Sequence, residues 1–180
     1  MHVLDAMQNS VDAGASRLEL SIHEDREQDR MVIQLNDNGK GMPRELAEKV
    51  LDPFVTTRKT RHVGLGLPLF AAAARRCEGD LQVESVPGEG TRLTAVFRYS
   101  HWDRAPLGDM PSALLAVLLS EHPVDVHYMH RVGSWQFCFD SSEIRKELGD
   151  VPLSFPPVRT WMLQTLQEGE RSLQESGACS

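Results

Sequence analysis

Apolar residues recur at spacings of three and four from Val3 to Ala13, a pattern that predicts an amphipathic helix. Gly14 follows directly, at a position where glycine often ends a helix. Residues 17–22 and 31–35 then alternate between apolar and polar, which predicts two strands. The polar residues 23–30 between them predict a turn, so we expect a β-hairpin.

The pattern changes after residue 42. Pro43 suits the first turn of a short helix through Val50. A second helix is predicted from Gly66 to near Gly79, followed by alternating strands at 81–86 and 91–97 around the turn 87–90. Because helices are mixed with antiparallel hairpins, we expect an α+β fold, a two-layer α/β sandwich with a mixed sheet.

The polar segment 100–109 contains Pro106 and Gly108 and predicts a domain boundary. Residues 1–100 would form the first domain, and residues 110–180 a small α+β C-terminal domain. In the second we expect a helix at 111–121, a hairpin of 124–130 with 135–139, a helix capped by Ser141 or Ser142 that reaches Leu148, and a last helix over 158–173.

Composition narrows the function classes. The 180 residues are 41% hydrophobic and 25% charged, as in ordinary globular proteins, and the net charge is -7. Nucleic acid is a poor default partner for an acidic chain, because phosphate contacts need basic residues. No apolar run approaches the ~20 residues that span a bilayer, so we expect no membrane partner. The cysteines, Cys77, Cys138 and Cys179, are odd in number and far apart. They predict neither a disulfide framework nor a zinc site, and they fit a cytoplasmic location.

Three polar side chains, Asp5, Asn9 and Asp12, share one face of the first predicted helix, because they are spaced by four and three residues. Carboxylate and amide oxygens are hard ligands of the kind that magnesium prefers. By itself such a stripe is more often a solvated helix face.

A second group is Asp37-x-Gly39-x-Gly41, placed where a predicted strand ends. The carboxylate can accept a hydrogen bond from an exocyclic amine, and the glycines let the backbone approach a flat ligand closely. The alternative interpretation is an ordinary Asp-Asn-Gly turn.

Two further blocks are Asp52-Pro-Phe-Val-Thr-Thr-Arg58 and Gly64-Leu-Gly-Leu67, the latter at the start of a predicted helix. Free backbone N–H groups and the positive end of a helix dipole favour a phosphate there. Basic residues between the blocks would offset triphosphate charge. A flexible loop before a helix is the alternative.

All four blocks in this order resemble the superfamily of ATPases shared by gyrases, heat-shock chaperones, sensor histidine kinases and mismatch-repair proteins. Residues 4–15 resemble its N box, residues 37–42 its first glycine box, residues 52–57 the F box of histidine kinases, and residues 64–67 the second glycine box. Gly88-Glu-Gly-Thr91, which precedes a strand, also resembles the corresponding segment of histidine kinases. The resemblance covers residues 2–99.

The resemblance implies ATP and Mg²⁺ as cofactors. Asn9 would bind the magnesium ion, Asp37 the adenine amine, and Thr91 would support the adenine contact through water. Gly39 and Gly41 would make room for the base, while Gly64 and Gly66 would shape the lid over the phosphates. The remaining expected nucleotide-binding residues are Asp12, Ala13, Met42, Phe54, Thr57, Arg58, Leu65 and Leu67.

Asp5 departs from the pattern of hydrolysing members, which carry a glutamate there as general base. A shorter side chain reaches less far toward a water, so we expect slow hydrolysis. The N box begins at the first residues, with no phosphoacceptor histidine before it, so a phosphoacceptor would lie on another protein. The expected function is an Mg-ATP-binding protein of histidine-kinase-like type that phosphorylates or regulates a protein partner. The alternatives are a non-catalytic ATP sensor and a mismatch-repair-like ATP hydrolase.

The C-terminal part contains fewer motifs that indicate a function. Residues 143–152 resemble stand-alone ATP-binding proteins encoded near iron-only hydrogenase components. His122, His127 and His130 suggest a metal site, but His127 and His130 differ in parity and would face opposite sides of a strand. We therefore expect ordinary surface histidines.

Overall fold

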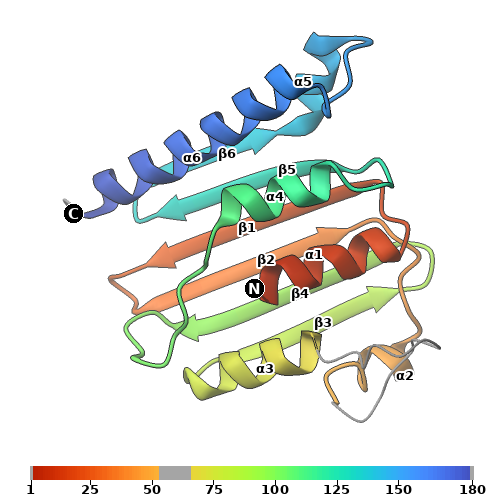
Figure 1. Cartoon of the computed structure of the whole chain (residues 1–180). Coiled ribbons are helices and arrows are strands. Elements are labelled where there is room, and N and C mark those ends of the chain that lie inside the picture. Colours follow the sequence, from red (N-terminus) through yellow and green to blue (C-terminus); the bar gives the residue numbers. More distant parts are fainter. Residues whose placement is uncertain (1, 53–65, 179–180) are drawn as a thin grey trace.

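The computed structural model describes residues 2–52 and 66–178. Six strands form one mixed sheet in the order β3-β4-β2-β1-β5-β6 (Figure 1). The strands are β1 (Arg17–Asp25), β2 (Arg30–Asp37), β3 (Asp80–Val86), β4 (Gly90–Arg98), β5 (Asp125–Val132) and β6 (Trp135–Asp140). The predicted α+β fold with a mixed sheet is confirmed.

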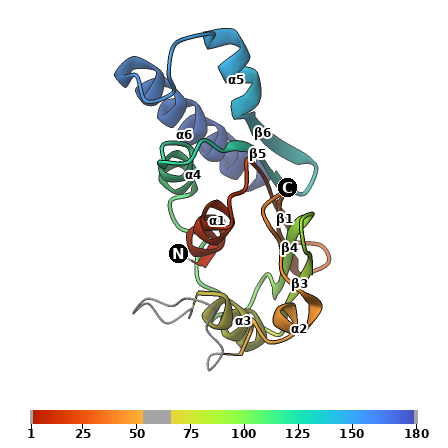
Figure 2. The ribbon, with the colours of Figure 1, turned by 90° about the vertical axis from the view of Figure 1, so that its right-hand side faces the viewer.

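Helices α1, α3, α4 and α6 cover one face of this sheet (Figure 2). The bounds are α1 (His2–Asp12), α2 (Arg44–Ala47), α3 (Gly66–Arg76), α4 (Met110–Leu118), α5 (Ser141–Leu148) and α6 (Pro156–Ala178). Buried apolar side chains from these helices and from the sheet form one continuous core. Burial of this apolar surface is the main term that stabilises the two layers.

Alternation along the strands explains why only one face is covered. Leu18, Leu20 and Ile22 of β1 are buried under the helices, whereas Glu19 and Ser21 between them are not. Because successive side chains point to opposite faces, a strand with this pattern fits a sheet that packs on one side only. The other face is lined mainly by polar side chains.

The three predicted hairpins are confirmed, since β1 pairs with β2, β3 with β4, and β5 with β6, all antiparallel. Two pairings were not suggested by the sequence, the antiparallel one between β2 and β4 and the parallel one between β1 and β5. In the parallel pairing Leu18 is opposite Val126. Through it, the strands of the C-terminal part continue the sheet of residues 1–100. The division into two domains stays a prediction, and in the structure the two parts share one sheet.

Several element boundaries differ from expectation. β1 continues to Asp25, so the polar turn is shorter than residues 23–30, and α2 ends at Ala47 rather than Val50. The cap of α5 is Asp140, whose carboxylate accepts the backbone N–H of Ser142 at 2.8 Å, and not a serine. α6 is longer than predicted, because it begins at the Pro156-Pro157 pair, which suits a first helical turn, and continues through polar residues after Leu173 to Ala178.

The prediction that the histidines lie at the surface is wrong for His130. Its side chain is 1% exposed and lies between Glu170 of α6 and Glu24 of β1, with ring nitrogens 2.9 Å and 3.4 Å from their carboxylate oxygens. Burial alone would lower the pKa of His130, but the two carboxylates outweigh it and raise that pKa to about 9. The Tyr128 hydroxyl donates to Glu170 at 2.7 Å, so this buried polar cluster joins α6 to the sheet.

Candidate nucleotide-binding site

A row of polar side chains crosses one end of the sheet. Ser85 of β3 is opposite Thr91 of β4, and Thr91 is opposite Asp37 of β2. All three have the parity of the buried residues on their strands, so they lie on the face that the helices cover. Ser10 of α1 is buried above the same row. The packing of α1 on the sheet therefore brings four polar groups together.

Asp37 is the centre of this group. Its Oδ1 atom accepts the backbone N–H of Gly39 at 2.9 Å and that of Thr91 at 3.3 Å. Its Oδ2 atom accepts the Ser10 hydroxyl at 2.6 Å. A carboxylate offers about four acceptor positions. Among the described residues, these three donors leave Oδ2 with room for one further hydrogen bond, and only a donor group such as an amine suits it.

Two glycines allow the loop after Asp37 to lie against the β3–β4 turn. A Cβ atom on Gly41 would stand 2.0 Å from the Val86 carbonyl oxygen, and one on Gly90 would stand 1.9 Å from the Asp37 carbonyl oxygen. Both residues have positive φ, 59° and 113°, which side-chain-bearing residues rarely adopt. The loop thus needs glycine at both positions for steric reasons.

The same loop is tied to the end of α1. The Lys40 N–H donates to the Ala13 carbonyl at 3.0 Å, and a Cβ atom on Gly39 would stand 3.1 Å from the Ala13 Cβ. Met42 donates its N–H to the Ser85 hydroxyl at 2.9 Å. The predicted residues Ala13, Gly39, Gly41 and Met42 therefore all take part in holding the loop after Asp37 against α1 and the β3–β4 hairpin.

The polar face of α1 lies beside α3. Asp5 and Asp12 are exposed and Asn9 is half-buried, as a shared helix face requires, and the Gln8 amide donates to Asp12 at 3.1 Å. Gly66 is the first residue of α3, and a Cβ atom there would stand 3.3 Å from the Cβ of Asp5. The start of one helix thus lies directly against the face that carries the expected magnesium ligand.

Other expected site residues differ in position. Leu67 is buried in the core with 8% of its surface exposed, so its side chain anchors α3 in the core. The residues Phe54, Thr57, Arg58, Gly64 and Leu65 lie outside the described residues. Within residues 2–52 and 66–178, no group of three or more His, Cys, Asp or Glu side chains is arranged to hold a metal ion. The expected magnesium site rests on Asn9, whose amide belongs to none of these types.

Ser10 and Ser85 are the residues that the sequence reasoning missed. A signal for Ser10 was present, because it continues the apolar stripe of Val3 and Met7 and a serine buried there needs a hydrogen-bond partner. For Ser85 the signal was its place in the hairpin opposite Thr91. Neither signal identified the residue with which the serine forms its hydrogen bond.

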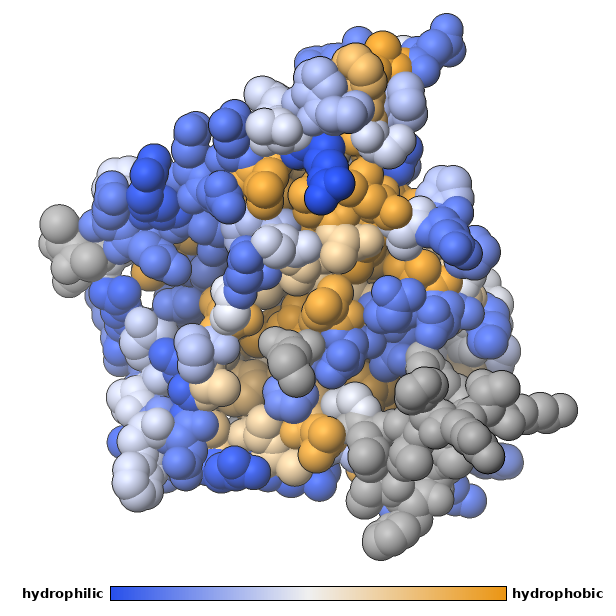
Figure 3. Space-filling view, viewed as in Figure 1, coloured by the Kyte–Doolittle hydropathy of each residue, from blue (hydrophilic) through white to orange (hydrophobic). Residues whose placement is uncertain are grey.

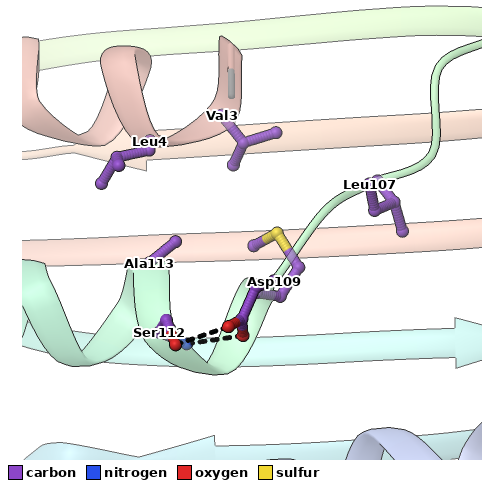
Figure 4. Close-up of a pocket in the computed structure, with 7 residues that line it drawn as sticks. Val3, Leu4, Leu107, Asp109, Ser112 and Ala113 are labelled. Carbon is purple, nitrogen blue, oxygen red and sulfur yellow. Dashed lines mark hydrogen bonds between the residues drawn. The ribbon is translucent and has the colours of Figure 1, made fainter.

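A hollow lies between α1 and α4, lined by residues other than those around Asp37. Apolar side chains gather in the middle of the helical face there (Figure 3), around a cavity of about 250 Å³ lined by Val3, Leu4, Leu107, Met110 and Ala113. Figure 4 shows Asp109 and Ser112 at its edge, hydrogen-bonded to each other at 2.6 Å and 3.0 Å. These two groups satisfy each other as the N-cap of α4.

Comparison with known proteins identifies the family of the chain. Residues 2–101 match the family described as histidine kinase-, DNA gyrase B-, and HSP90-like ATPases. The match covers more than half of the chain and contains α1, β1 to β4 and the glycine loop. The chain belongs to this family.

Three of the relatives are described as histidine kinases or sensor protein kinases. The signal transduction histidine-protein kinase AtoS of Escherichia coli is 35% identical over 95 residues, 52% of this chain and 16% of that protein. Sensor histidine kinase WalK of Bacillus subtilis is 29% identical over 113 residues, 57% and 18% of the two chains. Sensor protein kinase FleS of Pseudomonas aeruginosa is 37% identical over 94 residues, 52% and 23%. The aligned part is therefore less than a quarter of each relative.

Among solved structures, that of full-length ShkA in complex with AMPPNP aligns with a TM-score of 0.48 and 22% sequence identity, over 61% of this chain and 23% of that chain. None of the helices in the described part of the chain has the length and apolarity needed to span a membrane.

Proposed function

We propose that this protein binds Mg-ATP between α1, the 37–42 loop and α3, and uses it to phosphorylate or regulate a partner protein. The observation that carries the proposal is the environment of Asp37. Its carboxylate is fixed by Ser10, Gly39 and Thr91, and its remaining acceptor position suits the exocyclic amine of adenine. A half-buried, oriented acceptor of this kind discriminates between donors and acceptors on a ligand.

The phosphate side would be formed by α1 and α3. The Asn9 amide oxygen would hold the magnesium ion, and the backbone N–H groups at the start of α3, beginning with Gly66, would face the phosphates. When bound, ATP supplies a transferable phosphoryl group whose charge magnesium offsets. The protein's own task in such a reaction is mainly positioning.

Kinase or regulator activity is favoured over hydrolysis by the side chain at position 5. Asp5 lies on the polar face of α1 next to Gly66, where a longer glutamate would extend further toward the phosphates. The net charge of -7 supports a protein partner rather than nucleic acid. The second candidate is a sensor that changes its affinity for a partner on binding ATP, without phosphoryl transfer. The pattern of three scattered cysteines supports action in the reducing cytoplasm.

Isothermal titration of the purified chain with ATP, first with magnesium and then with a chelator, tests the binding step. We expect binding that weakens when magnesium is removed, and a loss of that magnesium dependence in Asn9→Ala. A variant at an exposed amide far from the site, Gln136→Ala on β6, serves as the matched control. Equal ATP affinity of the wild type with and without magnesium would contradict the assignment of Asn9.

The second step is tested by incubating the protein and its candidate partners with ATP labelled at the γ-phosphate. Transfer of label to a partner supports the kinase. Binding of a partner that depends on ATP, without label, supports the sensor. The Asp37→Asn variant should weaken either result.

A further inference from the structure

Ser85 makes three short contacts with one hydroxyl group. Its Oγ atom accepts the N–H of Met42 at 2.9 Å, lies 2.9 Å from the Gly90 carbonyl oxygen, and lies 2.9 Å from Oγ1 of Thr91. The side chain is half-buried and lies beside the proposed adenine acceptor, because Thr91 is opposite Asp37 on the next strand. No contact with the ligand itself has been assigned to Ser85, although its partners Thr91 and Met42 belong to the expected site.

The three contacts can be satisfied in one way without conflict. A serine hydroxyl has one proton and two lone pairs. The Gly90 carbonyl can only accept, so the Ser85 proton goes to it, and one lone pair accepts the Met42 N–H. The second lone pair must then accept the Thr91 proton. With its proton directed at Ser85, the Thr91 hydroxyl presents only lone pairs to the site.

We propose that Ser85 is a positioning residue that fixes the Thr91 hydroxyl as an acceptor and thereby sets the preference of the site for adenine over hypoxanthine. This inference rests on the proposed function. Asp37 and Thr91 would together offer only acceptors toward the edge of the base. Adenine carries an amine there, whereas hypoxanthine carries a carbonyl oxygen, which finds no donor among these side chains.

Removal of the Ser85 hydroxyl releases the Thr91 proton. The Thr91 side chain can then turn and donate to the hypoxanthine oxygen, or to a water bound to it. We expect Ser85→Ala to lower the ratio of the ITP to the ATP dissociation constant by about fivefold, the size of one net hydrogen bond. Ser85→Thr, which keeps the hydroxyl, should retain the wild-type ratio.

The experiment is a double-mutant cycle measured by titration with ATP and with ITP. Wild type, Ser85→Ala, Thr91→Val and the double variant are compared, with Ser21→Ala on the uncovered face of β1 as the control. If Thr91 carries the effect, Ser85→Ala should leave the ratio unchanged in the Thr91→Val background. If Ser85→Ala does not fold, Ser85→Cys replaces it, since a thiol is a weaker donor and acceptor.

The outcomes separate this inference from the function on which it rests. Failure of the wild type to bind ATP overturns the proposed function itself. If the wild type binds ATP, equal losses of ATP and ITP affinity in Ser85→Ala show that Ser85 only supports the loop, which overturns the positioning role. A change of ratio that persists without the Thr91 hydroxyl overturns it as well.

Discussion

The Ser10 hydroxyl donates a 2.6 Å hydrogen bond to Oδ2 of Asp37, across 27 positions of the sequence. Ser10 is 3% exposed, on the face of α1 that packs on the sheet, and Asp37 is the last residue of β2. This bond orients the one carboxylate oxygen that has room for a ligand. Helix packing and ligand recognition therefore depend on the same pair.

Replacement of Ser10 by alanine should weaken ATP binding while the fold persists. Hydrogen bonds to charged groups contribute about 1.5–3 kcal/mol, so we expect a loss of roughly tenfold or more in affinity, measured by titration calorimetry. Ser21→Ala, on the opposite face of the sheet, should bind ATP like the wild type. Unchanged affinity in Ser10→Ala would show that Asp37 needs no orientation from α1.

Asp37→Asn should weaken ATP binding at least as much as Ser10→Ala. The amide replaces one acceptor oxygen by an NH₂ group, which would either face the adenine amine or lose the backbone donors of Gly39 and Thr91. The expected loss is again on the order of 1.5–3 kcal/mol. Asp80→Asn, which removes an exposed ion pair with Arg75, is the control. Equal ATP affinities of the two variants would remove Asp37 from the site.

Gly41→Ala should destabilise the protein far more than Gly88→Ala. Both glycines have positive φ, 59° and 81°, but an added Cβ meets the Val86 carbonyl oxygen at 2.0 Å in the first case and nothing within 4 Å in the second. The Gly88 variant thus measures backbone strain alone, about 1–2 kcal/mol. Urea unfolding of both variants isolates the steric part. Similar free energies of unfolding would mean that the loop can move away from the β3–β4 turn.

The isolated protein should hydrolyse ATP slowly, and Asp5→Glu should raise the rate. Glutamate extends the carboxylate by about one bond, 1.5 Å, and a misplacement of ~1 Å can cost ~100-fold. Steady-state phosphate release measures both proteins, with Asp5→Asn as the variant that lacks a base. Fast release by the wild type would favour a hydrolase over a kinase or sensor. Identical rates for all three would assign Asp5 to the solvated helix face.

His130 predicts a dependence of stability on pH. Its pKa rises from 6.5 to about 9 on folding, so its contribution is complete below pH 6.5 and is lost as pH rises toward 9. The charged groups around it are Glu24, Glu170 and, beyond Glu24, Arg104. The melting temperature of the wild type should therefore fall across this range more steeply than that of His130→Gln.

The control for this prediction is His127→Gln. His127 lies on the same strand with 44% of its side chain exposed, and it bonds Asp140 rather than Glu170. This variant should retain the wild-type slope of melting temperature against pH. A slope that is the same in His130→Gln would mean that the buried ring stays neutral in the folded protein.

Much of the local structure followed from the sequence. The apolar spacing in α1 and the alternation of the three hairpins reflect contacts between near neighbours in the chain. The glycines at positions 39 and 41 were predicted from their motif, although they are needed for close approach to Ala13 and Val86, which are distant in the sequence. The burial of His130 could also have been predicted, because it points to the same face of β5 as the buried Val126 and Tyr128. A general expectation that histidines lie at the surface outweighed that pattern.

The sequence by itself determined which residues form α1, the hairpins and the glycine loop, because periodicity and turn chemistry act over a few residues. The tertiary structure alone decided that β5 lies beside β1, that Ser10 reaches Asp37, and that Glu24 reaches His130 across 106 positions. Such partners are chosen by the packing of whole layers. No local pattern records which buried polar group will meet which, since that depends on where every helix settles on the sheet.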